Sequence, residues 1–144
     1  LVWATTRIVL PEPTGENMAP LGLRTLTSWL LSGFVEKDVR VSLMSLGSLA
    51  LLFIPAEVVS PLAAEWEREV ERITGIERVR VVSLADGYAG YLETPSALEA
   101  RTGESANCWY GTEAVERLGD GVRELAAWMV ARQAGMTEGR RQER

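Results

Sequence analysis

Glu57 is the first side chain whose position along the sequence could carry chemistry. It follows an uninterrupted apolar run from Leu49 to Ala56, so it lies where a buried strand leaves the core. A carboxylate in such a place is partly desolvated unless a metal ion, an arginine or hydrogen bonds hold it. Glu57 is therefore a candidate functional carboxylate. The alternative is a solvated acid that flanks a helix beginning near Ser60 and Pro61.

Tyr88 and Tyr91 form the second candidate group. They stand three residues apart in the segment 85–91, where Ala and Gly residues let the backbone approach a neighbour closely. Two phenols at this spacing cannot both be hidden in a short strand, and they could flank a ligand. The alternative is a pair of loop tyrosines that pack on the core.

No chemistry is assigned to the other polar residues of this region. Asp86, Arg101 and Glu104 are predicted to be solvated loop charges. Cys108, next to Trp109, is predicted to be a small buried hydrophobic residue. Because the chain has no His, Cys108 lacks the usual base of a catalytic thiol.

Composition excludes several classes of site. The 144 residues are typical of one domain and include one Cys and no His. They therefore cannot hold a Ser-His-Asp triad, a disulfide framework or a Cys-based zinc site by themselves. The net charge of −5 argues against nucleic acid as a partner. No apolar run approaches the ~20 residues of a transmembrane segment, and no secretory signal is visible, so the localisation stays unknown.

Hydrophobic periodicity predicts one α/β domain over residues 1–134 and a polar tail over residues 135–144. Its mixed sheet has a β-hairpin, a β-α-β crossover and flanking helices. The predicted strands are Thr5–Leu10, Val39–Leu46, Leu49–Ile54 and Arg78–Leu84. The predicted helices are Leu21–Phe34, Pro61–Thr74 and a last one from Val115 to about Gln133. Ser60 is expected to cap the second helix and Gly75 to end it, and residues 86–111 are expected to form a long loop.

The middle of the chain has the length of a crossover that joins two parallel strands through a helix. In such units, the loops that leave the carboxyl ends of the strands build the binding site. Here these loops are Pro55–Glu57 and Ala85–Tyr88. We therefore expect the two loops to lie side by side.

Taken together, these segments resemble the neutral/alkaline (non-lysosomal) ceramidase family. Val41–Glu57 is similar to a family hairpin that ends in an apolar strand and Pro-Gly-Glu. Leu84–Pro95 is similar to a family segment with Asn-x-Tyr-x-x-Tyr followed by Thr. Glu104 and Tyr110-Gly111 fall where the family has a Tyr-Glu pair and an aromatic-Gly-Pro. The resemblance covers roughly Val39 to Leu125.

The resemblance implies a zinc amidohydrolase that cleaves the N-acyl bond of ceramide-type lipids. It implies Glu57 and Tyr91 as metal ligands with catalytic roles, and Tyr88 as a substrate-binding residue beside them. Two further ligands are histidines from an earlier part of the family's catalytic domain. Glu57 and Tyr91 should then converge within one coordination sphere, at ~3–6 Å from each other. Family members are commonly secreted, periplasmic or membrane-associated.

The chain departs from the family pattern at several positions. Ala56 stands in place of the Gly, Gly103 in place of the Tyr before Glu104, and Thr112 in place of the Pro after Gly111. Both His ligands are missing. Two function hypotheses follow: part of a zinc amidohydrolase that an upstream segment of the same protein completes, or a non-catalytic α/β module with a binding or structural role. In either case the chain alone is expected to be inactive.

Overall fold

The fold is a mixed α/β arrangement, as the sequence predicts. The computed structural model describes residues 1–14, 33 and 35–142. The predicted helix Leu21–Phe34 lies outside these residues, apart from Gly33. The elements are β1 (Val2–Val9), β2 (Asp38–Leu46), β3 (Leu49–Phe53), β4 (Glu57–Val58), α2 (Ser60–Thr74), β5 (Arg78–Val82), β6 (Tyr91–Leu92), α3 (Pro95–Ala100), a 3₁₀ turn η1 (Ser105–Asn107) and α4 (Gly111–Gln142).

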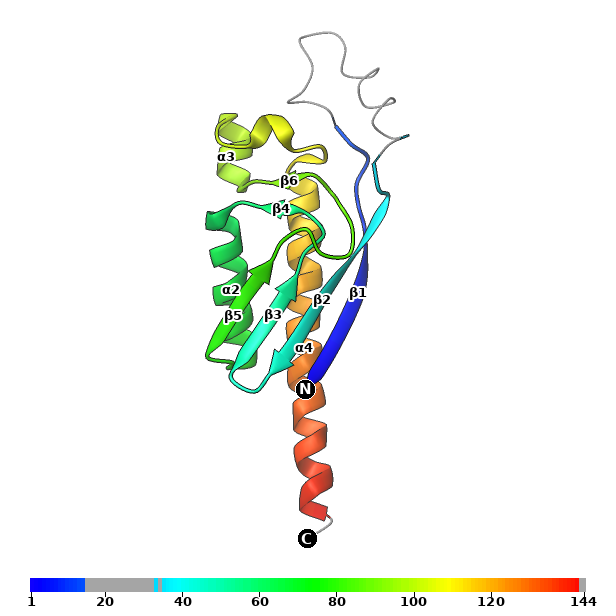
Figure 1. Cartoon of the computed structure of the whole chain (residues 1–144), viewed down its shortest axis with the longest axis vertical. Helices are drawn as coiled ribbons and strands as arrows, with labels where there is room; N and C mark the ends of the chain where they lie inside the picture. The colour runs from blue at the N-terminus through cyan, green and yellow to red at the C-terminus, as the bar shows by residue number, and fades with distance from the viewer. Residues whose placement is uncertain (15–32, 34, 143–144) are drawn as a thin grey trace.

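Four strands form the main sheet in the order β1-β2-β3-β5. The predicted hairpin is confirmed, because β2 and β3 pair antiparallel around a turn in which Gly47 has a φ of 65°. The predicted crossover is also confirmed, since β3 and β5 pair parallel with Leu49 opposite Arg78. The carboxyl ends of β3 and β5 therefore point in the same direction, as Figure 1 shows.

Both long helices cover one face of this sheet (Figure 1). Helix α2 contacts β5 and α4, and α4 contacts β1 and β2. The strands send alternate side chains toward the helices, which is why Leu43, Leu52 and Val79 are fully buried. Helices α2 and α4 each pack an apolar stripe against these side chains. Their buried members include Leu62, Trp66, Val70, Leu118, Val122 and Met129.

Helix α2 differs from the prediction at its first turn. Val59 is the N-cap, no side chain caps the helix, and Ser60 is already helical, so the prediction of a Ser60 cap is wrong. The other end is as predicted, because Gly75 has a φ of 70° and its N–H donates to Glu71 O at 2.8 Å.

The same helix protects the edge strand β5. The carboxylate of Glu71 accepts the N–H of Val79 at 3.1 Å, and that of Glu67 accepts the N–H of Val81 at 2.9 Å. These N–H groups face away from β3 and would otherwise be open to another strand. The acidic face of α2 thus ends the sheet.

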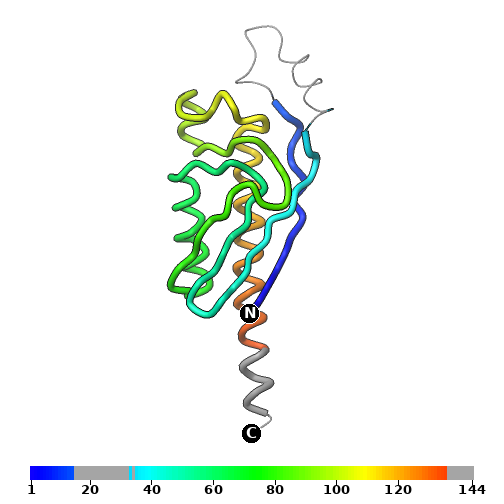
Figure 2. Tube along the Cα trace, viewed as in Figure 1, coloured from blue at the N-terminus to red at the C-terminus, as the bar shows by residue number. Residues whose placement is uncertain are grey.

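Two predicted boundaries need correction. Residues 86–111 are not a plain loop, because they contain β6, α3 and η1. Helix α4 begins at Gly111 and continues to Gln142, well past Gln133. Residues 134–142 have no apolar stripe, so hydrophobic periodicity could not detect its last turns. Figure 2 shows the path of residues 86–111, in green to yellow, beyond the end of the main sheet.

Two glycines in α4 should respond in opposite ways to substitution. A Cβ at Gly121 would collide with the side chain of buried Ile8 in β1, whereas a Cβ at Gly119 would make only ordinary contacts with Trp66 and Arg123. We expect Gly121→Val to lower the free energy of unfolding by about 2–3 kcal/mol through overpacking. Gly119→Ala should raise it by about 0.5–1 kcal/mol. Urea unfolding measures both, and equal stability of Gly121→Val and parent would contradict this packing.

Candidate functional site

The candidate site lies beyond the carboxyl ends of β3 and β5, where β4 and β6 form a parallel pair of two residues each. Glu57 in β4 is directly opposite Tyr91 in β6. The pair is held by the N–H of Glu57, which donates to Gly90 O at 2.9 Å. The N–H of Ala89 donates to Pro55 O at 2.6 Å, so the two loops lie side by side as expected. Opposed residues of adjacent strands share one face, and Glu57 and Tyr91 therefore meet on one rim.

The carboxylate of Glu57 is the centre of this group. The hydroxyl of Tyr88 donates to Glu57 Oε1 at 3.0 Å, and the same side chain is the main cause of the raised pKa of Tyr91. The structure thus brings together the three residues that the sequence predicts, although their chemical roles stay predictions. Glu57 is half-buried and lies two residues before the N-cap Val59 of α2, which no side chain caps.

Glu57 contributes to the raised pKa values of both phenols. Its hydrogen bond and negative charge raise the pKa of Tyr91 to about 12. For Tyr88, desolvation raises the pKa first, and the hydrogen bond to Glu57 adds to this effect. Both phenols are therefore protonated near neutral pH and can donate hydrogen bonds to an oxyanion.

An alkaline titration should show this coupling. All three tyrosines have raised pKa values, with Tyr110 reaching about 12 through burial rather than through Glu57. Phenolate absorbance should rise well above pH 10 in the folded chain and near pH ~10 in urea. Glu57→Gln should lower the pKa of Tyr91 and leave Tyr110 unchanged.

The same coupling links pH to stability. The folded chain holds the Tyr91 proton more tightly than the unfolded chain, so this contribution to stability is complete below pH ~10 and is lost as the pH rises toward about 12. A Tyr91 that titrates normally in the folded parent would contradict its contact with Glu57.

Trp109 supports the site, and the sequence analysis did not assign it a role. Its ring meets that of Tyr88 edge-on, with centroids 5.4 Å apart. Gly90 has a φ of 72°, and a Cβ there would stand 2.9 Å from Trp109 Cδ2. The small residue between Tyr88 and Tyr91 is therefore needed for this close approach.

Glu93 is a second supporting residue that sequence analysis missed. It is buried, and its carboxylate accepts the N–H of Thr94 at 2.7 Å and the N–H of Glu104 at 3.1 Å. Gly103 has a φ of 59°, and a Cβ there would collide with the Glu93 carboxylate. The glycine at 103, which departs from the family pattern, is thus required by the position of Glu93. These bonds join β6 to the segment before η1.

The remaining residues behave as predicted. Asp86, Arg101 and Glu104 are exposed. Cys108 is buried, and desolvation raises the pKa of its thiol to about 11, so the thiol stays protonated near neutral pH. Among the described residues other than Gly, only Leu84, Asp86 and Arg101 have positive φ values. Ala56 therefore fits its turn without strain, although the family pattern has Gly there.

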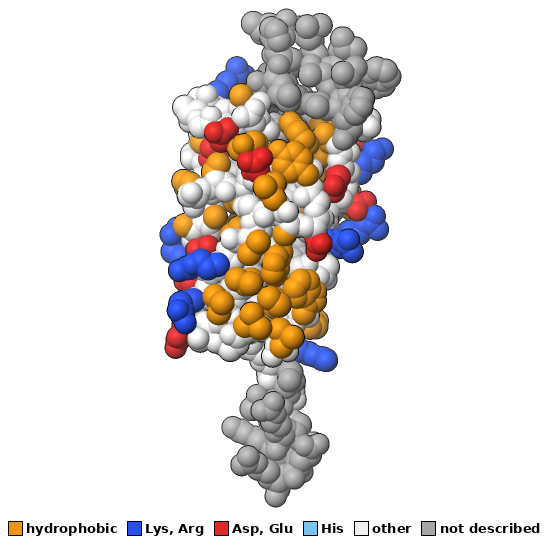
Figure 3. Space-filling view, in the orientation of Figure 1, with side chains coloured by type: hydrophobic (Ala, Val, Ile, Leu, Met, Phe, Trp, Pro, Cys, Tyr) orange, Lys and Arg blue, Asp and Glu red, His pale blue; other side chains and the backbone are white. Residues whose placement is uncertain are grey.

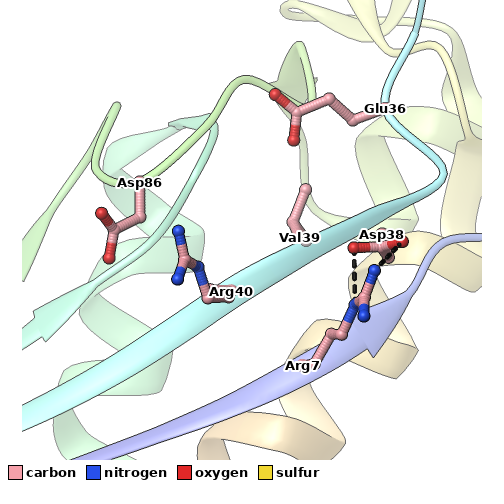
Figure 4. Close-up of a pocket in the computed structure, with 6 residues that line it drawn as sticks. All are labelled: Arg7, Glu36, Asp38, Val39, Arg40 and Asp86. Atoms are coloured by element: carbon pink, nitrogen blue, oxygen red, sulfur yellow. Dashed lines mark hydrogen bonds and ion pairs between the residues drawn. The ribbon is translucent and has the colours of Figure 1, made fainter.

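A polar pocket of about 500 Å³ adjoins the site. Glu36 connects the two, because its Oε1 accepts the N–H of Tyr88 at 3.3 Å. In Figure 4, the side chains of Arg40 and Asp86 point toward each other in the pocket. Those of Arg7 and Asp38 form an ion pair at 2.7 Å. That bond is the main reason that the pKa of Asp38 is lowered and that of Arg7 raised. The pocket can hold a polar group next to Tyr88.

The donors do not make a complete zinc site. Glu57 and Tyr91 offer one carboxylate and one phenol oxygen, whereas a catalytic zinc has three protein ligands. Residues 1–14, 33 and 35–142 contain no group of three or more His, Cys, Asp or Glu that could hold a metal ion, and the chain has no His. In the same described part, no helix is long and apolar enough to cross a membrane.

Solved structures show what this arrangement is similar to. The neutral ceramidase of Pseudomonas aeruginosa matches with a TM-score of 0.64 and 23% identity, over 68% of this chain. A ceramidase complexed with C2 matches with a TM-score of 0.66 and 22% identity, over 80% of this chain. The fold is ceramidase-like.

These ceramidases are much longer proteins. The match spans only 16% of the first chain and 18% of the second. No protein-family model and no curated protein match the sequence. The likeness therefore concerns the fold of one portion of a ceramidase.

Proposed function

We propose that this chain is part of a ceramidase-like zinc amidohydrolase that hydrolyses the amide bond of N-acyl sphingosine lipids. One observation carries the proposal: Glu57 and Tyr91 face each other on adjacent parallel strands, with Tyr88 bonded to the same carboxylate. The ceramidase-like fold supports it, because an isolated carboxylate and two phenols would not indicate a substrate.

In this proposal, the chain supplies part of the site. Glu57 and Tyr91 are two ligands, and an upstream segment of the same protein supplies two histidines. A phenol beside the metal could also donate a hydrogen bond to the oxyanion that develops when water attacks an amide carbon. Tyr88 bonds to Glu57 through its hydroxyl and to Glu36 of the polar pocket through its backbone N–H, which suits a substrate-binding role. The products would be a fatty acid and sphingosine.

The second candidate is a non-catalytic module that keeps the ceramidase-like scaffold. The incomplete donor set favours it, because the described residues and the His-free sequence cannot hold a catalytic zinc alone. The two candidates differ in what the whole protein can do. An upstream segment with two histidines favours the enzyme, and its absence favours the module.

Hydrolysis by the protein encoded by the complete reading frame decides between them. That protein should release fatty acid from an N-acyl sphingosine, and the 144-residue chain alone should not. Tyr91→Phe in the complete protein should slow the release, whereas Trp128→Phe, on the far helix, should not. A complete protein that binds no zinc and releases no fatty acid would establish the module.

A further inference from the structure

The sheet has one face without helices, and that face carries an apolar patch beside polar side chains such as Thr5, Arg7 and Arg80. Its side chains alternate with those that point into the core, and they come from all four strands of the main sheet. We call this set the open sheet face: Trp3, Met44, Leu46, Leu49, Leu51, Phe53 and Val82, with Leu84 beyond the end of β5. Figure 3 shows these strands covered by hydrophobic side chains.

Strand register makes the open sheet face continuous. Trp3 is opposite Met44, which is opposite Leu51. Leu46 is opposite Leu49, and Phe53 is opposite Val82. The rings of Trp3 and Phe53 lie 5.4 Å apart. A contiguous apolar surface of this kind on a folded domain marks an interaction site.

Two features indicate that a further layer covers this face. Parallel strands are normally buried on both faces, and β3, which pairs parallel with β5, carries apolar residues on both sides. Leu84 has a φ of 58° and is 57% exposed. A bulky side chain in the left-handed region is strained, and this one is exposed two residues beyond the end of β5.

We infer that the open sheet face packs against the same polypeptide segment that completes the candidate site. The chain spans 16–18% of its ceramidase neighbours, so most of such a protein lies outside it. The face also leads to the site, because β5 continues through Leu84 to Tyr88. One covering layer can therefore bury the apolar strands and bring the missing donors to Glu57.

The rim of the face predicts the chemistry of the covering layer. Arg40 and Arg78 are exposed at its borders, and no described residue forms an ion pair with either. The layer should thus present apolar side chains at its centre and carboxylates at its edges. The identity of the segment depends on the proposed function, but the coverage of the face can be measured without any catalysis.

Carbene footprinting of the complete protein and of the 144-residue chain tests this inference. Labelling of Trp3, Leu46 and Leu84 should fall several-fold in the complete protein. Labelling of Trp128, which is 44% exposed on α4, should change little. A matched pair of variants gives a second readout. Leu46→Lys with Leu84→Asn should lower the Tm of the complete protein more than that of the short chain, and Trp128→Lys should affect both equally.

Several results would overturn it. Equal labelling of the two proteins would do so, as would a reading frame that adds no segment. Protection in the short chain that grows with its concentration would identify a second copy as the partner. Protection by phosphatidylcholine vesicles alone would identify a lipid surface. Protection without hydrolysis would refute only the proposed function, and hydrolysis without protection would refute only this inference.

Discussion

Glu57→Gln in the complete protein should lower kcat/KM for N-acyl sphingosine hydrolysis by about 10²–10³-fold. The change keeps the shape of the side chain. It also keeps an oxygen that can accept the hydrogen bond of the Tyr88 hydroxyl, which lies 3.0 Å from Oε1 in the parent. It removes the negative charge that a metal ligand supplies. Steady-state kinetics with a fluorescent N-acyl sphingosine would measure the loss.

A matched control separates this loss from a general charge effect. Glu65→Gln removes the same charge from an exposed position of α2 and should leave kcat/KM unchanged. Full activity of the Glu57→Gln protein would mean that Glu57 is no ligand, and the module would then be the better account of the site.

Glu93→Ala should lower the free energy of unfolding by about 3 kcal/mol, because two partly buried N–H groups lose their acceptor. These are the N–H groups of Thr94 and Glu104, at 2.7 and 3.1 Å from the carboxylate. The change also frees β6, which carries Tyr91. Urea unfolding of the 144-residue chain measures the effect.

Two further variants make this prediction specific. Glu99→Ala removes an exposed carboxylate from α3 and should change stability by less than ~0.5 kcal/mol. Gly103→Ala should destabilise the parent through its φ of 59° and its collision with Glu93, but less so when Glu93 is already Ala. Additive effects of Gly103→Ala and Glu93→Ala would show that the two residues do not interact.

Much of the fold could be predicted from local pattern. Alternation and a Gly turn predict the β2–β3 hairpin, and a strand-helix-strand spacing predicts the parallel crossover. The missed elements lack these signals. Strand β6 has only two residues, and α3 has six, with one buried residue, Leu98. Such short elements exist because of tertiary contacts, such as the pairing of Tyr91 with Glu57.

The candidate site shows the same division. Glu57 and the tyrosines stand out because a carboxylate ends an apolar run and small residues separate two phenols. Glu93 and Trp109 had no such signal. Glu93 is buried by contacts with a segment about ten residues further along, and Trp109 meets Tyr88 only after the chain turns back through η1. Sequence spacing does not show contacts of this kind.

A zinc titration of the 144-residue chain beside the complete protein tests the central claim most directly, namely that the chain holds two ligands of a shared zinc site. Isothermal titration should show weak or no binding to the short chain, which offers only Glu57 and Tyr91. The complete protein should bind one zinc ion tightly and lose it in Glu57→Gln. Tight stoichiometric binding by the short chain, or unchanged zinc affinity in the Glu57→Gln protein, would contradict the account.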